Sequence, residues 1–226
     1  MGKLIVIEGL DGSGKSTQLE LLPQNLKKSG IDSRSVSFPD YDSNSSALVK
    51  MYLGGEFGKD TSMDAYQASS LYAVDRLCTY KKDLEEFYNN DGIIVMDRYV
   101  QSNMLHQAGK IGDRENVDKF LNWLDELEFD TLKLPRPNKV IFLDVPVDVS
   151  TRLMEERGIH KTGTVKDVHE QNPEHLVKAY NSGKYVSEKY DWDVIQCTEN
   201  EKIKSIEEIS ELIWNSIKED INALNK

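Results

Sequence analysis

Short apolar runs alternate with helical patterns along this chain. The first run covers residues 4–7, and four further runs of strand length occupy residues 34–38, 92–97, 139–144 and 192–197. Between them, apolar residues recur at helical spacing over residues 15–29, 43–53, 62–90, 116–129, 146–157, around 176–180 and from 205 onward. This alternation predicts an α/β fold in which five parallel strands form one sheet with helices on both faces.

The run at residues 92–97 is apolar until it ends in Asp97, which is typical of a strand buried on both faces of a parallel sheet. Sheets of this kind bind ligands beyond the carboxyl ends of their strands. Gly9, Pro39 and Asp97 all fall at such ends. We therefore expect the ligand site at that edge.

Two helical segments predict which side chains face the core. Ser205 and Glu208 form a capping-box pattern that begins the last helix. The isoleucines expected along its buried face are Ile206, Ile209, Ile213, Ile217 and Ile221. The side chains of segment 62–90 expected to face a core are Tyr66, Leu71, Val74, Leu77, Leu84 and Phe87.

The glycine-rich stretch after the first strand fits G-x-x-x-x-G-K-[ST], a phosphate-binding loop. Its residues are Gly9, Leu10, Asp11, Gly12, Ser13, Gly14, Lys15, Ser16 and Thr17. Glycines let the backbone curl so that its N–H groups point at phosphate oxygens, and the following helix N-terminus adds positive potential. The motif predicts that Lys15 reaches the β- and γ-phosphates of a nucleotide and that the Ser16 hydroxyl binds Mg²⁺.

Composition narrows the partners of this site. The chain has 226 residues, 38% of them hydrophobic and 30% charged, and no apolar run approaches 18 residues, so we expect one domain and no membrane partner. Its two cysteines, Cys78 and Cys197, have no paired spacing, which favours the reducing cytoplasm. The net charge of −11 disfavours nucleic acid as a partner but allows a small phosphorylated ligand in a locally basic cleft.

Other residues favour phosphoryl transfer over other nucleotide chemistry. A guanine-binding N-K-x-D is absent from the sequence, since the Asn138-Lys139 pair lacks the Asp, and no D-x-x-G occurs outside the loop. A phosphoryl transferase needs a second cation that holds the acceptor phosphate close to the donor despite their repulsion. Arg98, directly after the strand that ends in Asp97, supplies one.

Five motifs, in order and spacing, resemble the thymidylate kinase family over residues 3 to about 215. They are the loop at 9–17, Phe38-Pro39, the segment 71–76, the segment 97–102 with Gln107 behind it, and the segment 142–146. The resemblance implies a single P-loop kinase domain, residues 1–226, with a mobile lid at about 157–170. It also implies a cytoplasmic homodimer that converts dTMP to dTDP with ATP and Mg²⁺, as dTTP synthesis for DNA replication requires.

The resemblance also implies roles for individual residues. Catalysis would involve Lys15, Arg98, Asp97 and Asp11, with Asp11 near the sugar 3′-hydroxyl and Arg98 bridging both phosphates. ATP would be bound by the loop 9–17 together with Arg152 and Arg157, and Mg²⁺ by Ser16 and Asp97. The substrate would be bound by Phe38, Pro39, Tyr72, Arg76, Arg98, Ser102, His106 and Gln107, with Tyr72 stacked on thymine and Arg76 bonded to its carbonyl oxygen.

Three departures from the family pattern limit this transfer of roles. Tyr41 stands where the family often has an Arg that grips the acceptor phosphate, and His106 stands where an aromatic hydroxyl usually helps to exclude ribose. Gly12 occupies the place of an Arg found in the loop of one branch, so the transition-state cation should come from the lid, as in the bacterial branch. The candidates for that cation are Arg152, Arg157, Lys161 and Lys166.

Alternatives remain for single residues and for the whole chain. Asp75 and Arg76 would otherwise form a solvated helix face or an ion pair, Tyr72 would fill a core, Asp97 and Arg98 would form a structural pair, and Asp144 is expected to be structural. The chain would otherwise be a kinase of another deoxynucleoside monophosphate or of a nucleoside, or a weakly active nucleotide-binding regulatory protein.

Overall fold

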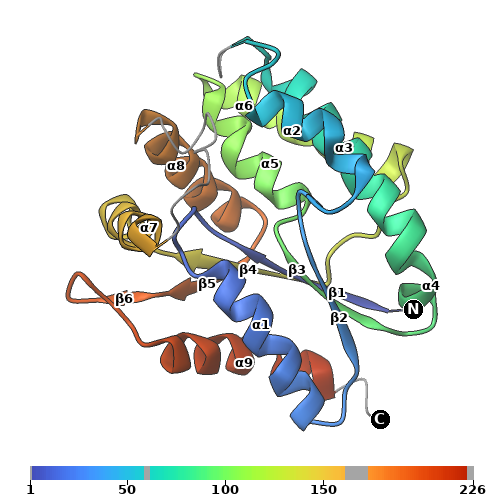
Figure 1. Ribbon diagram of the computed structural model, residues 1–226, viewed down its shortest axis with the longest axis vertical. Helices are drawn as coiled ribbons and strands as arrows, with labels where there is room; N and C mark the ends of the chain where they lie inside the picture. Colours follow the sequence, from blue (N-terminus) through green and yellow to red (C-terminus); the bar gives the residue numbers. More distant parts are fainter. Residues whose placement is uncertain (1, 59–61, 161–172, 223–226) are drawn as a thin grey trace.

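A single parallel sheet of five strands forms the centre of the molecule (Figure 1). The computed structural model describes residues 2–58, 62–160 and 173–222, without the side chains of 157–160, 173 and 219–222. In spatial order the strands are β2 (Ser33–Ser37), β3 (Ile93–Asp97), β1 (Lys3–Glu8), β4 (Lys139–Asp144) and β5 (Asp193–Gln196). All four pairings are parallel, so the predicted five-stranded parallel sheet is confirmed.

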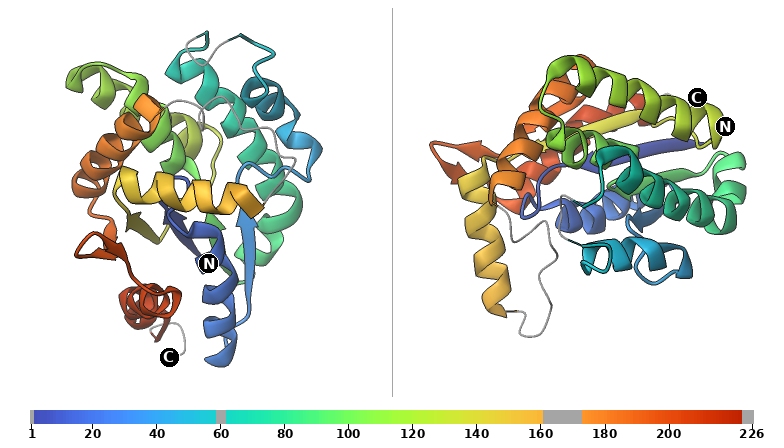
Figure 2. Two further views of the ribbon diagram at one scale, coloured as in Figure 1. Left: turned by 60° about the vertical axis from the view of Figure 1, so that its left-hand side comes forward. Right: turned by 90° about the horizontal axis from the view of Figure 1, so that it is seen from above.

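Helices cover both faces of the sheet because its central strands are apolar on both sides. Leu4 and Val6 face one core, while Ile5 and Ile7 face the other. The first core is covered by α3 (Ala65–Thr79), η2 (Tyr80–Leu84), α4 (Glu85–Asn89), α5 (Val100–His106), α6 (Arg114–Asp125) and α8 (Pro173–Lys189). The second is covered by α1 (Lys15–Lys28), α7 (Val147–His160) and α9 (Ile206–Asn222). In the left view of Figure 2, α1 (blue) and α9 (red) lie at the bottom, and α7 (gold) runs across the middle.

Shorter elements complete the chain. They are η1 (Asn44–Ser46) and α2 (Ala47–Leu53) after β2, η3 (Ala108–Lys110) after α5, η4 (Glu126–Thr131) after α6, and the antiparallel pair β6 (Thr198–Glu199) and β7 (Lys202–Ile203). The strands β6 and β7 and the helix α5 are absent from the sequence-based prediction. Each of these strands has only two residues, and α5 is seven residues long and rich in polar side chains, so neither produces an apolar period.

Several apolar residues predicted to face a core are instead at the surface. Val74 is 44% exposed because α3 turns polar residues such as Asp75 and Arg76 inward. Tyr66 is 38% exposed, although the edge of its ring contacts Trp123 of α6. Ile206 is 51% exposed at the first turn of α9, and its carbonyl accepts from Gln18 Nε2 of α1 at 3.2 Å.

The capping box and three of the other predicted isoleucines of α9 agree with the prediction, while the side chain of Ile221 lies outside the described residues. Ser205 Oγ accepts from the N–H of Glu208 at 3.2 Å, and Glu208 Oε2 accepts from the N–H of Ser205 at 2.8 Å, so the capping box is present. Ile209, Ile213 and Ile217 are buried.

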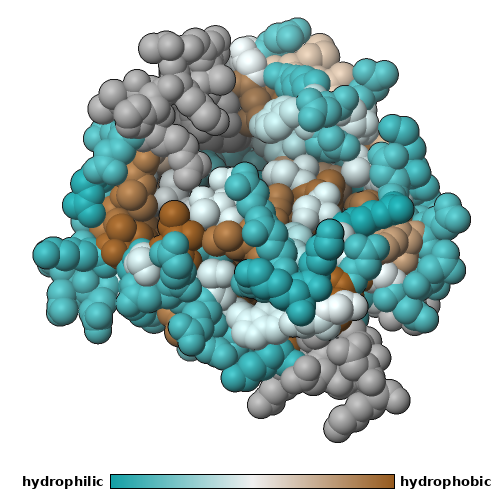
Figure 3. Space-filling model, turned by 60° about the horizontal axis from the view of Figure 1, so that its bottom comes forward, coloured by the Kyte–Doolittle hydropathy of each residue, from teal (hydrophilic) through white to brown (hydrophobic). Residues whose placement is uncertain are grey.

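Figure 3 shows a face on which hydrophilic residues predominate and apolar ones appear in the grooves between them. In the part of the chain that is described, no helix has the length and apolar character that crossing a membrane requires.

Candidate active site

The phosphate-binding loop connects the carboxyl end of β1 to the N-terminus of α1. Gly12 (φ 81°) and Gly14 (φ 91°) adopt the left-handed conformation that glycine permits. The Lys15 side chain is 6% exposed, and its Nζ donates to the carbonyls of Gly9 at 3.0 Å and Leu10 at 2.8 Å. The loop therefore already holds its lysine at the mouth of a helix N-terminus, where anions bind.

Helix α7 packs directly against this loop. A Cβ at Gly12 would lie 2.4 Å from the Ser150 carbonyl oxygen and 2.9 Å from Met154 Cγ, so a side chain at position 12 does not fit unless α7 moves. Arg152 is exposed on the same helix. The predicted lid cations Lys161 and Lys166 lie outside the described residues, as do the Arg157 side chain and most of the predicted lid at 157–170.

Arg98 connects the phosphate loop to the helix α5. It follows β3 with a φ of 66°, and its N–H donates to the Ile7 carbonyl at 3.1 Å, which ties it to β1. Its guanidinium forms an ion pair with Asp11 of the loop, donates to Ser102 Oγ at 2.7 Å and lies 2.9 Å from His106 Nε2. Ser102 and His106 follow Arg98 at intervals of four, so the short helix α5 places both beside it.

Neighbouring charges determine the protonation states of Asp11 and Arg98. Although burial favours the neutral acid, the charges of Arg98 and Lys15 hold the pKa of Asp11 well below its usual range. Burial opposes the charge of Arg98, but Asp11 and Glu8 outweigh it and raise the pKa of the guanidinium. Both groups are therefore charged at neutral pH, and Arg98 places a positive charge between the phosphate loop and α5.

A cavity of about 250 Å³ lies beyond this pair. Its lining includes all eight predicted substrate-binding residues as well as Asp11: Phe38, Pro39, Tyr72, Arg76, Arg98, Ser102, His106 and Gln107. Tyr41 also lines it, from the position at which the family often has an Arg. These residues come from the phosphate loop, the segments after β2 and β3, the helix α3, and α5 with the residue that follows it, so the fold unites positions that are far apart in the sequence.

The interior of this cavity is polar. Arg76 is 2% exposed, its guanidinium forms a bidentate pair with Glu128 of η4, and its Nη1 donates to the Tyr99 carbonyl at 3.3 Å. The alternative of a solvated helix face is therefore wrong. An Asp75–Arg76 pair is wrong as well, because Asp75 accepts from the Asp40 N–H at 2.9 Å and from the Ser45 hydroxyl at 2.5 Å.

Two buried amide side chains of the cavity each have one atom without a partner among the described residues. They are Oε1 of Gln107 and Nδ2 of Asn103, on residues that are 1% and 3% exposed. A buried polar atom without a hydrogen bond is costly, so each of these atoms requires a partner such as a polar ligand or an ordered water. Asn103 is missing from the sequence-based prediction; had α5 been recognised, its spacing of four from Gln107 would have placed both on one face.

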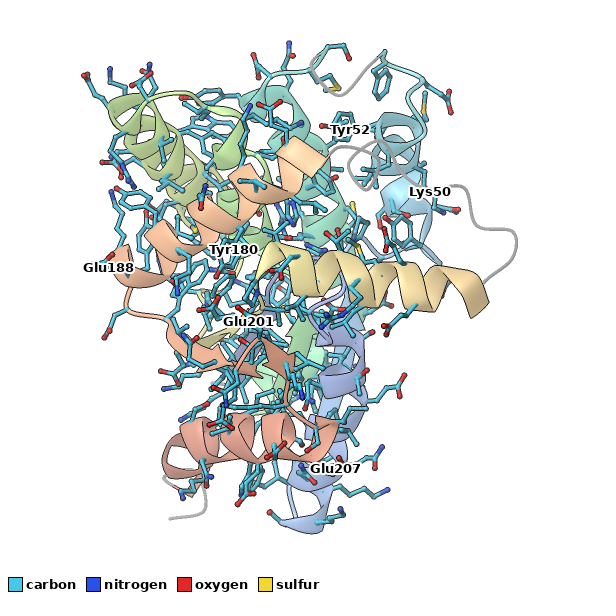
Figure 4. All side chains as sticks on the ribbon, turned by 90° about the vertical axis from the view of Figure 1, so that its left-hand side faces the viewer. Lys50, Tyr52, Tyr180, Glu188, Glu201 and Glu207 are labelled. Carbon is cyan, nitrogen blue, oxygen red and sulfur yellow. The ribbon has the colours of Figure 1, made fainter. Side chains whose placement is uncertain are left out.

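Tyr72, the residue expected to stack on the base, also packs against hydrophobic neighbours. Tyr72 contacts the cluster formed by Val49, Tyr52, Leu53 and Ala68, and its ring meets that of Tyr52 edge-on with centroids 6.2 Å apart. Figure 4 labels Tyr52 on α2. Tyr72 is nevertheless only half-buried and lines the cavity, so its packing and a ligand-stacking role are compatible.

Two carboxylates end the neighbouring strands β1 and β3. Asp97 and Glu8 are buried, and Asp97 Oδ1 and Glu8 Oε2 accept no hydrogen bond from any described residue. Burial raises the pKa of Glu8 to about 7, although Arg98 and Lys15 oppose this. Residues 2–58, 62–160 and 173–222 contain no cluster of three or more metal-binding side chains, and Mg²⁺ typically needs only one or two carboxylates besides substrate phosphates. The orphaned oxygen of Asp97 and the exposed Ser16 hydroxyl at the start of α1 fit that requirement.

Asp144 has a structural arrangement, as expected. It is 4% exposed and accepts hydrogen bonds from Lys184 at 2.6 Å, Tyr180 at 2.8 Å and Gln196 at 2.9 Å. Tyr180, labelled in Figure 4, extends from α8 to make this contact. The three bonds connect α8 and β5 to the end of β4.

Comparison with known proteins agrees with this geometry. A model of the thymidylate kinase family, described as "Thymidylate kinase", matches residues 7–201. A probable thymidylate kinase from Pyrococcus horikoshii is 33% identical over 158 residues, which cover 70% of this chain and 72% of the relative. A thymidylate kinase from Prochlorococcus marinus is 29% identical over 209 residues, which cover 90% and 89%. The solved structure of a thymidylate kinase from Candida albicans has the same fold, with a TM-score of 0.73 and 21% identity, covering 98% of this chain and 93% of that one.

Proposed function

Because this chain belongs to the thymidylate kinase family and is a phosphotransferase that phosphorylates dTMP, we propose that the loop 9–17 forms its donor side and the cavity beyond Arg98 its acceptor side. One observation carries this proposal: the eight side chains expected to bind the substrate, and Asp11 of the loop, line the same cavity. The Asp11–Arg98 ion pair joins that cavity to the loop. The donor and acceptor phosphates would therefore meet at Arg98.

On the donor side, Lys15 and the loop N–H groups bind the ATP phosphates. Lys15 exchanges its two carbonyl contacts for phosphate oxygens when ATP enters. Since position 12 has no room for an Arg, the further cation comes from α7 or the segment after it. Arg152 and Arg157 on α7 are the residues proposed to bind ATP in this way.

On the acceptor side, the cavity complements a thymine base. Tyr72 stacks on the ring, and Phe38 and Pro39 also line the pocket. Arg76 offers N–H donors to a ring carbonyl, and Gln107 Oε1 accepts from the ring N–H, with Asn103 Nδ2 as a further donor. Ser102 and His106 keep Arg98 aimed at the acceptor phosphate.

The transfer itself needs no nucleophile from the protein. An oxygen of the acceptor phosphate forms a bond to the γ-phosphorus of ATP while the bond from that phosphorus to the β-bridging oxygen breaks, and ADP leaves. Lys15 and Arg98 stabilise the charge on the transferred group, and Asp11 approaches the acceptor sugar. Ser16 and Asp97 would hold Mg²⁺, which supplies positive charge to the phosphate oxygens when it is bound.

A homodimer is the proposed assembly. Leu48 on α2 and Tyr66 and Val74 on α3 leave 42%, 38% and 44% of their surface exposed on two neighbouring helices, which supports an apolar contact with a second copy. Light scattering of the wild type and of Val74→Glu measures the oligomeric state, and a monomeric wild type refutes the dimer.

Cys78 and Cys197 are both unpaired thiols, which supports the cytoplasm as the compartment.

A coupled assay of ADP release over all nucleoside and deoxynucleoside monophosphates tests the assigned specificity. We expect dTMP to have the highest kcat/KM, because the cavity offers donors and an acceptor that match its base. If dTMP were no better than dCMP or dGMP, the assignment of this cavity would be wrong. Tight ATP binding with turnover no faster than hydrolysis would instead favour a regulatory protein.

A further inference from the structure

A buried arginine–glutamate pair connects the acceptor cavity to the helical turn that follows α6. Arg76 of α3 is 2% exposed, and Glu128 of η4 is fully buried. Arg76 Nε donates to Glu128 Oε2 at 3.2 Å, and Nη2 donates to Oε1. Both carboxylate oxygens therefore accept from one guanidinium, in the bidentate geometry that fixes the plane of an arginine side chain.

A third contact completes the orientation of Arg76. Its Nη1 donates to the carbonyl of Tyr99 at 3.3 Å. A guanidinium has five N–H groups. Three of them have acceptors among the described residues, which leaves two, one on each terminal nitrogen, for the cavity that Arg76 lines.

The segment that carries Glu128 is unusual in its backbone. Helix α6 ends at Asp125 and continues as a π-helical stretch, η4, over Glu126–Thr131. Such wide turns occur frequently at functional sites because they redirect a side chain that a regular helix would place elsewhere. In this protein the stretch buries Glu128 against α3 while Asp125, three residues earlier, pairs with Arg136 at the surface.

We propose that Glu128 is a positioning residue that holds Arg76 as a fixed hydrogen-bond donor to the 4-oxo group of the pyrimidine base and thereby selects against 4-amino bases. This inference rests on the proposed role of Arg76 in the acceptor cavity. Glu128 balances the arginine charge, so the cavity offers N–H groups without a net cation that would attract a phosphate. Both carboxylate oxygens of Glu128 already accept from Arg76, so neither is available to accept from an amino group of the base.

The chemistry of the two bases makes this arrangement selective. Thymine carries a carbonyl oxygen at position 4, which accepts from the two remaining N–H groups of Arg76. Cytosine carries an amino group there, whose N–H bonds point at the same donors. A site built to bond one group leaves its buried polar atoms unpaired with the other, which is a strong source of discrimination.

Glu128→Gln is the direct test, because it keeps the shape of the side chain and replaces one accepting oxygen with a donating NH₂. The measurements are kcat and KM for dTMP and for dCMP, and KM for ATP. Asp125→Asn is the matched control, since it makes the same carboxylate-to-amide change in another bidentate arginine pair, with bonds of 2.5 and 2.7 Å to Arg136, on the surface of α6. Its kinetics should equal those of the wild type.

For Glu128→Gln we expect KM for dTMP to rise about tenfold with kcat within about threefold, and the preference for dTMP over dCMP to fall about tenfold or more. KM for ATP should not change. If the variant does not fold, Glu128→Asp retains the charge with a shorter reach, and KM for dTMP should still rise. A purely structural pair would lower the melting temperature and leave the dTMP/dCMP ratio unchanged, and that result overturns the proposal.

Arg76→Met separates this proposal from the one on which it rests. If Arg76→Met leaves KM for dTMP unchanged, the assignment of the acceptor cavity fails. If Arg76→Met weakens dTMP and Glu128→Gln alters neither KM nor the dTMP/dCMP ratio, the cavity assignment stands and the role of Glu128 is refuted.

Discussion

The contact between the phosphate loop and α7 makes Gly12→Ala an informative substitution. Gly12 has a φ of 81°, and a Cβ there would lie 2.4 Å from the backbone oxygen of Ser150, which has no flexible end that yields. The left-handed conformation costs an L-residue about 1–2 kcal/mol. Forcing α7 away adds about 1–3 kcal/mol, the range for overpacking a close-packed contact.

We therefore expect Gly12→Ala to lower the free energy of unfolding by about 2–5 kcal/mol, or the melting temperature by roughly 6–15 °C for a chain of this size. The control is Gly30→Ala. Gly30 has nearly the same φ, 79°, but a Cβ there meets nothing within 4 Å. It should cost only the conformational part, about 1–2 kcal/mol.

Thermal and urea unfolding without nucleotide measure both variants, and ATP titration adds a functional readout. KM for ATP should rise in Gly12→Ala, because the loop or α7 must shift, and should stay unchanged in Gly30→Ala. If the two variants lose the same stability, α7 does not press on the loop. The packing argument against an Arg at position 12 would then fail.

Three further predictions follow from single contacts. Lys15→Ala should abolish turnover while circular dichroism shows an intact fold, and a near-normal rate would refute the role of Lys15. Tyr41→Arg restores the cation that the family often has at this position; if it lowers KM for dTMP, the missing charge explains the departure, and if not, another group already supplies it. Burial favours neutral Asp144, but hydrogen bonds from Lys184, Tyr180 and Gln196 outweigh it and hold its pKa below the usual range of an aspartate. The stability that these bonds contribute is therefore present above about pH 4, the usual aspartate pKa, and is lost as pH falls through the lowered pKa. Asp144→Asn should cost about 2 kcal/mol in urea unfolding at pH 7 and less at pH 3, whereas equal losses at both values would contradict the assignment.

The periodic part of the fold was predictable from sequence because burial imposes it. Strands β1, β3 and β4 are buried along nearly their whole length, so their apolar runs mark them clearly. Helix α5 was not predictable in this way. It turns Ser102, Asn103 and His106 toward a ligand cavity, and side chains selected for that purpose do not follow an apolar period.

The same reasoning explains which site residues were missed. Residues in local motifs, such as Lys15 and Arg98, are visible in sequence because their spacing carries chemistry. Glu128 has no such signal, since it acts on Arg76 from 52 positions away through a π-helical turn that no local pattern predicts. Asp75 shows the reverse error, because adjacency to Arg76 suggested a pair that the helix geometry separates.

The loop and the acceptor cavity form one electrostatic unit. Asp11 lines the cavity and pairs with Arg98, and in the proposed site it would neutralise that guanidinium until an acceptor phosphate arrives. Because Arg98 also contacts Ser102 and His106, its guanidinium would stay in place when that phosphate competes with Asp11. Position 12, by contrast, is filled by α7, so no cation reaches the transferred group from the loop at that point. In the proposed site the acceptor-side cation, Arg98, is thus pre-organised, whereas the donor-side cation beyond Lys15 would have to come from α7 or from the residues after it.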